Sequence, residues 1–324
     1  MTTVFHSFAD KRVLVTGGAG FVGSHVVDAL LERGARVTVI DDLSTGFEEF
    51  VPKAPRVELV RGNLLDQPLL DRLCQGQDLV FHFAANADVR EGLLHPRRDV
   101  EQNLLATQNV LEAMRKHGVK DIAFSSTGAI YGDCAVLPTP EDAPFPIQTS
   151  LYGASKVASE GLLTAYAFGY GFNVWLFRFV SLLGPRYTHG HVFDFWRKLR
   201  SDPTRLEILG NGEQKKSYIH VADCVAGMLT AIERADGPIN ILNLGHDEWL
   251  EVNESVRIIC RELGVSPKLS YTGGERGWVG DAPKLLLDTS RIRALGWKPT
   301  RSIQSSIIDT VRFLEENPYC AERR

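Results

Sequence analysis

Short β-branched apolar runs alternate with longer amphipathic segments over the first 180 residues of this 324-residue chain. The apolar runs predict buried strands, and the segments with apolar residues three and four apart predict helices. Strands that alternate with helices predict an α/β fold, a doubly wound parallel sheet with right-handed crossovers. The predicted strands are 13–15, 36–40, 57–61, 79–83, 122–125 and 173–178, and the predicted helices are 99–117, 151–171 and one that starts at about residue 22.

The pattern changes near residue 181, where the predicted elements become shorter and more mixed. We therefore predict a large domain over residues 1–180 and a smaller mixed α/β lobe over 181–324, with some lobe elements returning to the large domain. The cleft between the two parts is the expected ligand site. The lobe elements are helices 192–199, 221–233 and 252–263, strands 206–209 and 239–244, and a terminal helix from residue 303.

Three glycines follow the first predicted strand. Gly17, Gly20 and Gly23 are three residues apart, and Phe21 and Val22 open the next predicted helix. Glycine here permits a tight turn, lets the backbone approach a pyrophosphate and brings helix and strand close together. The open N–H groups and the dipole of a helix N-terminus attract phosphate. The stretch is a variant of the Rossmann dinucleotide-binding fingerprint, and these five residues are candidate cofactor contacts.

Two acidic residues end the second predicted strand. Asp41 lies eighteen positions past Gly23 (41 − 23), where the fingerprint places the carboxylate that accepts the adenosine ribose hydroxyls. Asp42 follows directly, and two carboxylates would repel a ribose 2′-phosphate, so we predict NAD rather than NADP. The alternative is that the glycines only turn the chain and the acids only cap a loop.

Further candidate cofactor contacts follow the third and fourth predicted strands. Polar Asn63 beside apolar Leu64 suits the reading and sandwiching of an adenine ring. Ala84 and Ala85 are small, so backbone can approach a ligand there.

A tyrosine and a lysine stand four residues apart at the start of a predicted helix. This spacing puts Tyr152 and Lys156 on one helix face. A neighbouring ammonium lowers the pKa of a phenol, which a general base at neutral pH requires. The predicted strand before them ends at Ser125 and Thr127. A hydroxyl group there could share the reacting proton with Tyr152. For a Tyr–Lys pair alone, the alternative is an ordinary surface pair.

Together, four motifs resemble the extended short-chain dehydrogenase/reductase family, and within it the nucleotide-sugar 4-epimerases. The motifs are residues 16–23, 81–85, 125–132 and 152–156, and the likeness continues at 210–214 and 296–299. The resemblance implies that tightly held NAD takes hydride from C4 of a UDP-hexose or UDP-hexuronate and returns it to the other face of a transient 4-keto sugar. It implies Thr127, Tyr152 and Lys156 as catalytic residues, Ser125 beside the nicotinamide, and Asn103 on a helix lining the site.

The resemblance also implies contacts to the substrate nucleotide, and this chain departs from the family pattern there. Ser181 stands where the family has an asparagine. Lys216 stands where the family has an arginine, so its ammonium would bind the diphosphate as a point charge without the paired hydrogen bonds of a guanidinium. Arg276 and Asp281 resemble the family's nucleotide clamp, although their spacing differs from it.

Three basic residues are candidates for the sugar or the diphosphate. Arg186 and His191 belong to an unusual loop, and Arg90 is a second candidate arginine. An arginine there could hold a hexuronate carboxylate with two hydrogen bonds. The alternative is that Arg186 braces its loop and that His189 and His191 are polar surface.

The two residues after Thr127 separate subfamilies. Sugar 4,6-dehydratases carry Asp-Glu there and uronate decarboxylases a glutamate, whereas this chain has Gly128 and Ala129. Neither can move a second proton, which favours simple 4-epimerisation. The other hypotheses are a reductase or dehydratase of the same family, and a non-catalytic NAD-sensing protein that would not need the intact Thr127, Tyr152 and Lys156.

Composition sets limits on partners. The net charge of −4 gives no overall attraction to nucleic acid or to an anionic membrane. Five cysteines without metal-ligand spacing suit reduced thiols, and the pair His189 and His191 lacks a third ligand, so we expect no metal. Without a signal peptide or a bilayer-spanning run, we expect a cytoplasmic protein. Apolar stripes on helices 99–117 and 151–171 are either core or, as the family implies, part of a homodimer seam.

Overall fold

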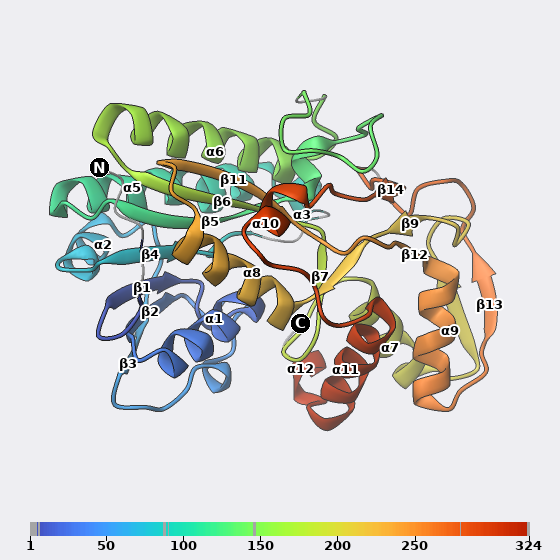
Figure 1. The fold of residues 1–324 in the computed structure, drawn as a ribbon. Coiled ribbons are helices and arrows are strands. Elements are labelled where there is room, and N and C mark those ends of the chain that lie inside the picture. The colour runs from blue at the N-terminus through green and yellow to red at the C-terminus, as the bar shows by residue number, and fades with distance from the viewer. Residues whose placement is uncertain are drawn as a thin grey trace.

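A seven-stranded parallel sheet forms the centre of the described residues (Figure 1). The computed structural model describes residue 5 and residues 7–86, 89, 91–144, 147–278 and 280–322. The strand order is β11-β6-β5-β4-β1-β2-β3. Strands β1 to β3 are added toward one edge of the sheet and β4 to β6 toward the other, which confirms the predicted doubly wound sheet. The strands are β1 (Arg12–Thr16), β2 (Arg36–Asp41), β3 (Val57–Arg61), β4 (Leu79–His82), β5 (Asp121–Thr127), β6 (Asn173–Phe179) and β11 (Ile239–Leu244).

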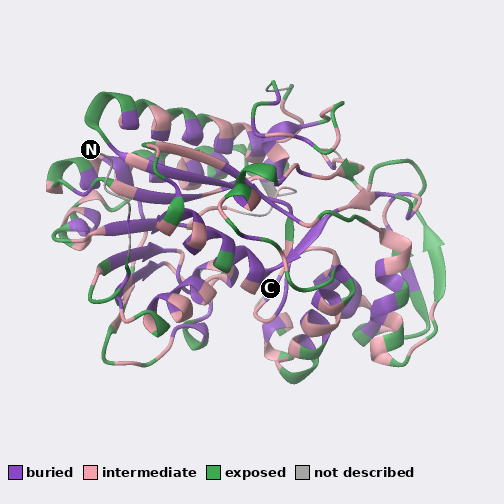
Figure 2. Cartoon of the chain, in the orientation of Figure 1, coloured by how far each residue is buried: buried purple, intermediate pink, exposed green. Residues whose placement is uncertain are grey.

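Each face of the sheet packs into its own hydrophobic core. Successive side chains of a strand point to opposite faces, so Val13 and Val15 join one core and Leu14 the other, and all three are fully buried. The inner strands of the sheet are accordingly mostly buried in Figure 2, whereas the edge strand β3 is not. Burial on both faces explains why such strands appear in the sequence as continuous apolar runs.

Helices cover both faces of the sheet. On one side α1 (Phe21–Glu32) packs against α8 (Val221–Arg234), and on the other α5 (Ala106–His117) lies between α2 (Gln67–Cys74) and α6 (Leu151–Tyr170). The eight-residue α2 is absent from the sequence-based prediction. No helix within the described ranges is both long and apolar enough to cross a membrane.

The predicted helix 99–117 is interrupted by a π-helical segment. The chain runs through α4 (Pro96–Asp99), the π-helix η2 (Val100–Leu105) and then α5. A proline occupies the first turn of α4, where its missing N–H is not needed. The π-helical turn buries Asn103, which a continuous α-helix would present differently, and such turns are frequent at functional sites. Short helices flank this region and the sheet: η1 (Glu48–Phe50), α3 (Glu91–Leu94) and η3 (Gly128–Tyr131).

Most elements after residue 180 form a smaller body beside the sheet, on the right in Figure 1. Helices α7, α9 and α11 pack on one another there, whereas β11 returns to pair with β6 in the main sheet. The predicted strand 206–209 is shifted by one residue, to 205–208. The helices are α7 (His191–Ser201), α9 (Val252–Leu263), α10 (Ser290–Ala294), α11 (Ile303–Glu316) and α12 (Tyr319–Glu322), and the strands are β7 (Ser181–Leu183), β8 (Arg205–Ile208), β9 (Lys215–Lys216), β10 (Tyr218–His220), β12 (Leu250–Glu251), β13 (Lys268–Tyr271) and β14 (Lys284–Leu285).

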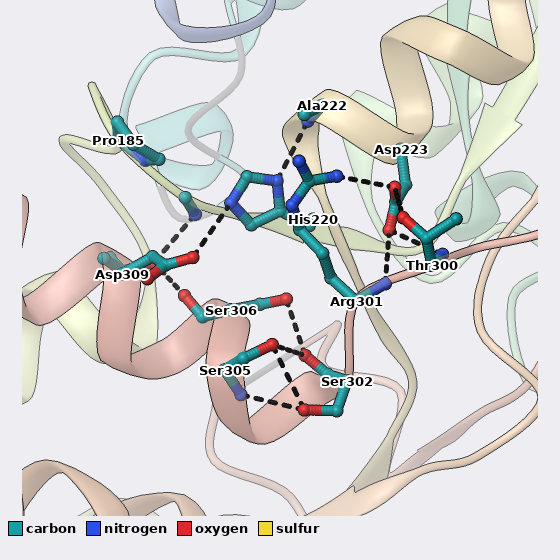
Figure 3. A network of polar contacts seen from close by, with 12 residues as sticks. Pro185, His220, Ala222, Asp223, Thr300, Arg301, Ser302, Ser305, Ser306 and Asp309 are labelled. Atoms are coloured by element: carbon teal, nitrogen blue, oxygen red, sulfur yellow. Dashed lines mark hydrogen bonds and ion pairs between the residues drawn. The ribbon is translucent and has the colours of Figure 1, made fainter.

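A polar network fastens α11 and the residues just before it to α8 (Figure 3). Asp223, in the first turn of α8, accepts hydrogen bonds from the backbone N–H groups of Thr300 and Arg301 and from their side chains, at 2.7–3.0 Å. Nδ1 of His220 accepts the N–H of Ala222 at 3.1 Å, so the proton of the neutral ring lies on Nε2, which faces Asp309 of α11 at 3.6 Å.

Candidate active site

One large cavity lies at the carboxyl ends of the central strands. Its volume is about 1320 Å³, and both the sheet and the smaller body line it. Most of the residues predicted from the sequence meet there. The predicted residues that line it are Gly17, Gly20, Phe21, Val22, Gly23, Asp41, Asp42, Asn63, Leu64, Ala84, Ala85, Ser125, Thr127, Tyr152, Lys156, Ser181, His191, Lys216 and Asp281.

The glycine turn has no room for side chains. Gly17 has a φ of +70°, and a Cβ on it would lie 2.6 Å from the backbone nitrogen of Ala84. A Cβ on Gly23 would lie 2.2 Å from the carbonyl oxygen of Gly17. Helix α1 starts after Gly20 without a side-chain cap, so its first N–H groups face the cavity. These features fit a dinucleotide pyrophosphate.

The acidic pair at the end of β2 is held in place by the backbone and by Asn63. The carboxylate of Asp41 accepts the N–H groups of Ala19 (3.0 Å) and Leu43 (2.9 Å), and burial raises its pKa. Nδ2 of Asn63 donates to Asp42 at 3.0 Å. Asn63 thus fixes an acidic residue at the cavity wall besides lining the cavity itself, and the two carboxylates suit ribose hydroxyls.

Lys156 is buried at the back of the cavity, with 2% of its surface exposed. Its ammonium donates to the carbonyl of Ser125 at 2.8 Å and lies 5.9 Å from the ring centroid of Tyr152. Burial lowers the pKa of Lys156 to about 7, and the negative charges of Glu160 and Asp99, which raise it, are the smaller effects. Both the charged and the neutral form of Lys156 are therefore populated near neutral pH.

Tyr152 lies beside Thr127, as predicted. Burial raises the pKa of Tyr152 to about 12, a hydrogen bond with Thr127 works in the opposite direction, and the charge of Asp99 adds to the rise. The ammonium of Lys156 is directed at the Ser125 carbonyl. Burial is thus the largest effect on the phenol, and its activation by Lys156 stays a prediction.

Three predicted residues that the structure describes, Asn103, Arg276 and Arg186, do not line the cavity wall. Asn103 is buried behind it, where it accepts the N–H of Asn86 at 2.8 Å and donates to the hydroxyl of Ser155 at 2.9 Å. Arg276 donates to both carboxylate oxygens of Asp133, at 3.1 and 2.6 Å. Arg90 lies outside the described residues.

Arg186 does not line the cavity, although the residues that follow it do. Its guanidinium forms an ion pair with Asp28 of α1 at 2.7 Å and lies 5.8 Å from the ring centroid of Phe50. These partners favour the alternative in which Arg186 braces its loop, and its contact with the sugar or the diphosphate stays a prediction.

The smaller body contributes an ion pair to the cavity wall. Lys216 pairs with Asp281, and its ammonium lies 4.8 Å from the ring centroid of Trp278. His191 bonds to the hydroxyl of Ser255 at 2.8 Å, and burial together with the charge of Lys216 lowers its pKa to about 3. His191 is therefore neutral. Trp278 also lines the cavity and was missed, because no local spacing marks a tryptophan in an irregular loop as a ligand contact.

The described residues contain no group of three histidine, cysteine or acidic side chains that could hold a metal ion.

The chain resembles known proteins over most of its length. The model of the NAD dependent epimerase/dehydratase family matches residues 13–245. A UDP-glucose 4-epimerase of Streptomyces lividans is 32% identical, and the match covers 95% of this chain and 97% of that protein.

Two solved structures of UDP-glucose 4-epimerases share the fold. The enzyme of Thermotoga maritima, solved with UDP-glucose, is 33% identical with a TM-score of 0.87, over 95% of this chain and 99% of that one. The enzyme of Thermus thermophilus, solved with NAD, is 34% identical with a TM-score of 0.84, over 94% of this chain and 99% of that one.

Proposed function

The chain belongs to the NAD-dependent epimerase/dehydratase family, and we propose that it is an NAD-dependent 4-epimerase of a UDP-hexose or UDP-hexuronate. One observation carries the proposal: Thr127, Tyr152 and Lys156 line the same cavity as the glycine turn. The relatives solved with NAD and with UDP-glucose support both ligands.

The residues of this chain have distinct parts in the reaction. The glycine turn and the acidic pair Asp41 and Asp42 hold NAD, which accepts a hydride and gives it back. Tyr152 exchanges the proton of the 4-hydroxyl, with Thr127 in hydrogen-bond contact. Lys156, fixed by the Ser125 carbonyl, supplies positive charge or a proton at the back of the site.

The neighbourhood of Gly128 argues against a dehydratase. A Cβ on Gly128 would lie 3.1 Å from the carbonyl oxygen of Phe179 and 3.2 Å from a methyl group of Leu285. A carboxylate side chain at this position would need the surroundings to move. The site is thus built for proton exchange at one hydroxyl, as epimerisation needs, and lacks the second acid–base group there.

The substrate nucleotide is assigned to the smaller body. Lys216, Asp281, Ser181 and His191 line the cavity together with the glycine turn. We propose that the bound diphosphate replaces Asp281 as the ion-pair partner of Lys216. The carboxylate of Asp281 can then accept hydrogen bonds from hydroxyl groups of the nucleoside. Arg276 would act indirectly here, because its guanidinium donates to the backbone carbonyl of Asp281 at 2.6 Å.

Activity on a small panel of sugar nucleotides tests the proposal. Purified protein is incubated with UDP-glucose, UDP-glucuronate and UDP-N-acetylglucosamine, and conversion of one of them to its 4-epimer without net NADH is expected. Tyr152→Phe and Lys156→Met should be inactive, while Tyr170→Phe, at the exposed end of the same helix, should keep full activity. Full activity in the first two variants would refute the assignment, and loss of water from the sugar would identify a dehydratase.

Two further expectations belong to this proposal. We infer a homodimer that joins two copies through α6 and the neighbouring η2, because Phe168 is 88% exposed and Leu105, Val100 and Tyr170 are also exposed. Sedimentation should show a dimer for the wild type and a monomer for Phe168→Asp. We also place the enzyme in the cytoplasm, where its five free cysteines would stay reduced.

A further inference from the structure

A buried chain of hydrogen bonds runs beneath the glycine turn. Oγ1 of Thr16 bonds to Nδ1 of His82 at 2.7 Å, and Nε2 of His82 bonds to Oγ1 of Thr107 at 2.9 Å. Thr16 also accepts the N–H of Ala84 at 3.2 Å, and Thr107 donates to the carbonyl of Asn103 at 2.5 Å. Thr16, His82 and Thr107 are at most 1% exposed.

These partners determine where the protons lie. Thr107 gives its only proton to the Asn103 carbonyl, so its oxygen accepts from Nε2 of His82. Nδ1 of the neutral ring then accepts from the hydroxyl of Thr16. Burial, with the charge of Lys156, lowers the pKa of His82 to about 3, so the ring stays neutral. His82 is thereby held in one tautomer and one orientation.

Asn103 extends the chain to the helix that carries Tyr152. Its Nδ2 donates to the hydroxyl of Ser155 at 2.9 Å, and that hydroxyl donates to the carbonyl of Tyr152 at 2.8 Å. The linking side chains all lie behind the cavity wall, whereas the residues that they hold line it. The linking residues are Thr16, His82, Thr107, Asn103 and Ser155, and the held residues are Gly17, Ala84, Asn86 and Tyr152.

We propose that His82 is a positioning residue that fixes the cofactor turn relative to Tyr152. The proposal rests on the proposed function and adds a group that touches neither cofactor nor sugar. Proton and hydride exchange at one carbon need the phenol and the cofactor in one geometry, and a displacement of about 1 Å costs about 100-fold in rate. A polar chain with one arrangement keeps this geometry where apolar packing alone would leave several.

Paired substitutions at Thr16 and Thr107 separate the effect of the hydroxyl group from the effect of side-chain packing. Thr16→Val and Thr107→Val keep the volume and remove the hydroxyl, and each should lower kcat by about tenfold or more with the sugar KM within about twofold. Thr16→Ser and Thr107→Ser keep the hydroxyl and lose a methyl group, and should stay within about twofold of the wild-type kcat. The reverse order would show that packing matters and would overturn the proposal.

The double variant tests whether His82 is the shared link. Both valine substitutions break the same chain, so the double variant should lose little more than the worse single variant. A loss equal to the product of the two single losses would contradict a common link. Thr310→Val is the matched control, because Thr310 of α11 is equally buried. Its hydroxyl accepts the N–H of Gly184 and donates to the carbonyl of Ser306, both at 2.7 Å. Loss of this hydroxyl should lower stability and leave kcat unchanged.

Retained cofactor gives a readout that does not depend on the sugar. NAD is released from each purified variant by denaturation and quantified by mass, and the valine variants should retain less than the serine variants and the Thr310→Val control. If the wild type epimerises no sugar nucleotide, the proposed function fails, while this order of NAD retention still supports the chain. Equal NAD retention in all variants would overturn the proposed role of His82.

Discussion

The ammonium of Lys156 donates to the backbone carbonyl of Ser125, at 2.8 Å. The same nitrogen lies 4.6 Å from the ring centroid of Phe124, so the charge is surrounded by ring and backbone rather than by water. Its lowered pKa expresses the free energy that burial of this charge costs the folded state.

Removing that charge should stabilise the protein while it abolishes activity. Lys156→Met keeps an unbranched chain of similar length, and we expect the free energy of unfolding at pH 7 to rise by about 1–4 kcal/mol. The folded pKa of about 7 lies below the ordinary value of 10.5, so the unfolded state binds more protons between these values and wild-type stability rises with pH across this window. Urea unfolding at pH 7 and 9.5 checks both points. A variant less stable than the wild type at pH 7 contradicts the prediction.

The buried ion pair of Arg178 and Glu160 should be costly to break. Two hydrogen bonds of 3.0 and 2.7 Å join the guanidinium to the carboxylate, and both side chains are buried. Glu160→Ala leaves an uncompensated charge and should lower the free energy of unfolding by about 3–5 kcal/mol. Glu254→Ala, which breaks an exposed pair with Arg257, should change it by at most about 1 kcal/mol. Similar losses in the two variants would contradict the argument.

A methyl group in the glycine turn should prevent cofactor binding. Gly23→Ala drives a Cβ against the Gly17 carbonyl, so the turn must open and the phosphate cradle is lost. We expect at least about a 100-fold loss of NAD affinity by calorimetry, the discrimination typical of a displaced binding geometry. Gly169→Ala, in α6 with nothing within 4 Å of the new Cβ, should bind NAD like the wild type. Normal NAD affinity in Gly23→Ala would rule out the turn as the cofactor site.

Acid should destabilise the fold from about pH 6.5 downward. Burial lowers the pKa of His82 and His191 to about 3 and that of His25 to about 4, below the ordinary value of 6.5. The unfolded chain therefore binds protons that the folded protein does not, so the stabilisation is complete above pH 6.5 and is lost as the pH falls toward 4. Each histidine contributes about 1.4 kcal/mol per pH unit in that window.

Chemical unfolding at pH 7.5, 6 and 5 measures this slope. His191→Gln keeps a partner for Ser255 and should flatten the slope, because it removes one of the contributing histidines. A free energy of unfolding that does not change between pH 6.5 and 5 would contradict the prediction.

The sequence was informative where function depends on neighbours along the chain. Gly17 and Gly23 meet within one turn, and Tyr152 and Lys156 within one helical turn, so spacing alone brings these groups together. Strands such as β1 were recognisable because both of their faces are buried. The interruption at Val100–Leu105 was not predicted, because no local spacing marks where the hydrogen bonds of a helix change from the α to the π pattern.

The partners of long side chains could not be predicted in this way. Arg186 pairs with Asp28, 158 positions away (186 − 28), and Arg276 pairs with Asp133. Nothing in the local sequence distinguishes an arginine that braces a loop from one that meets a ligand, since the choice depends on which carboxylate the fold brings nearby. Asn103 shows the same limit, because its helix was predicted and its burial behind the cavity wall was not.

The pairing of β11 with β6 has a consequence for synthesis of the chain. All six residues of β11 find partners along β6, so the sheet that carries the glycine turn has an unfinished edge until residues 239–244 have left the ribosome. Until then β6, which is buried almost throughout in the finished protein, would offer unpaired backbone to other nascent chains. Maturation of the cofactor half therefore waits for a strand that follows the first elements of the smaller body in the sequence.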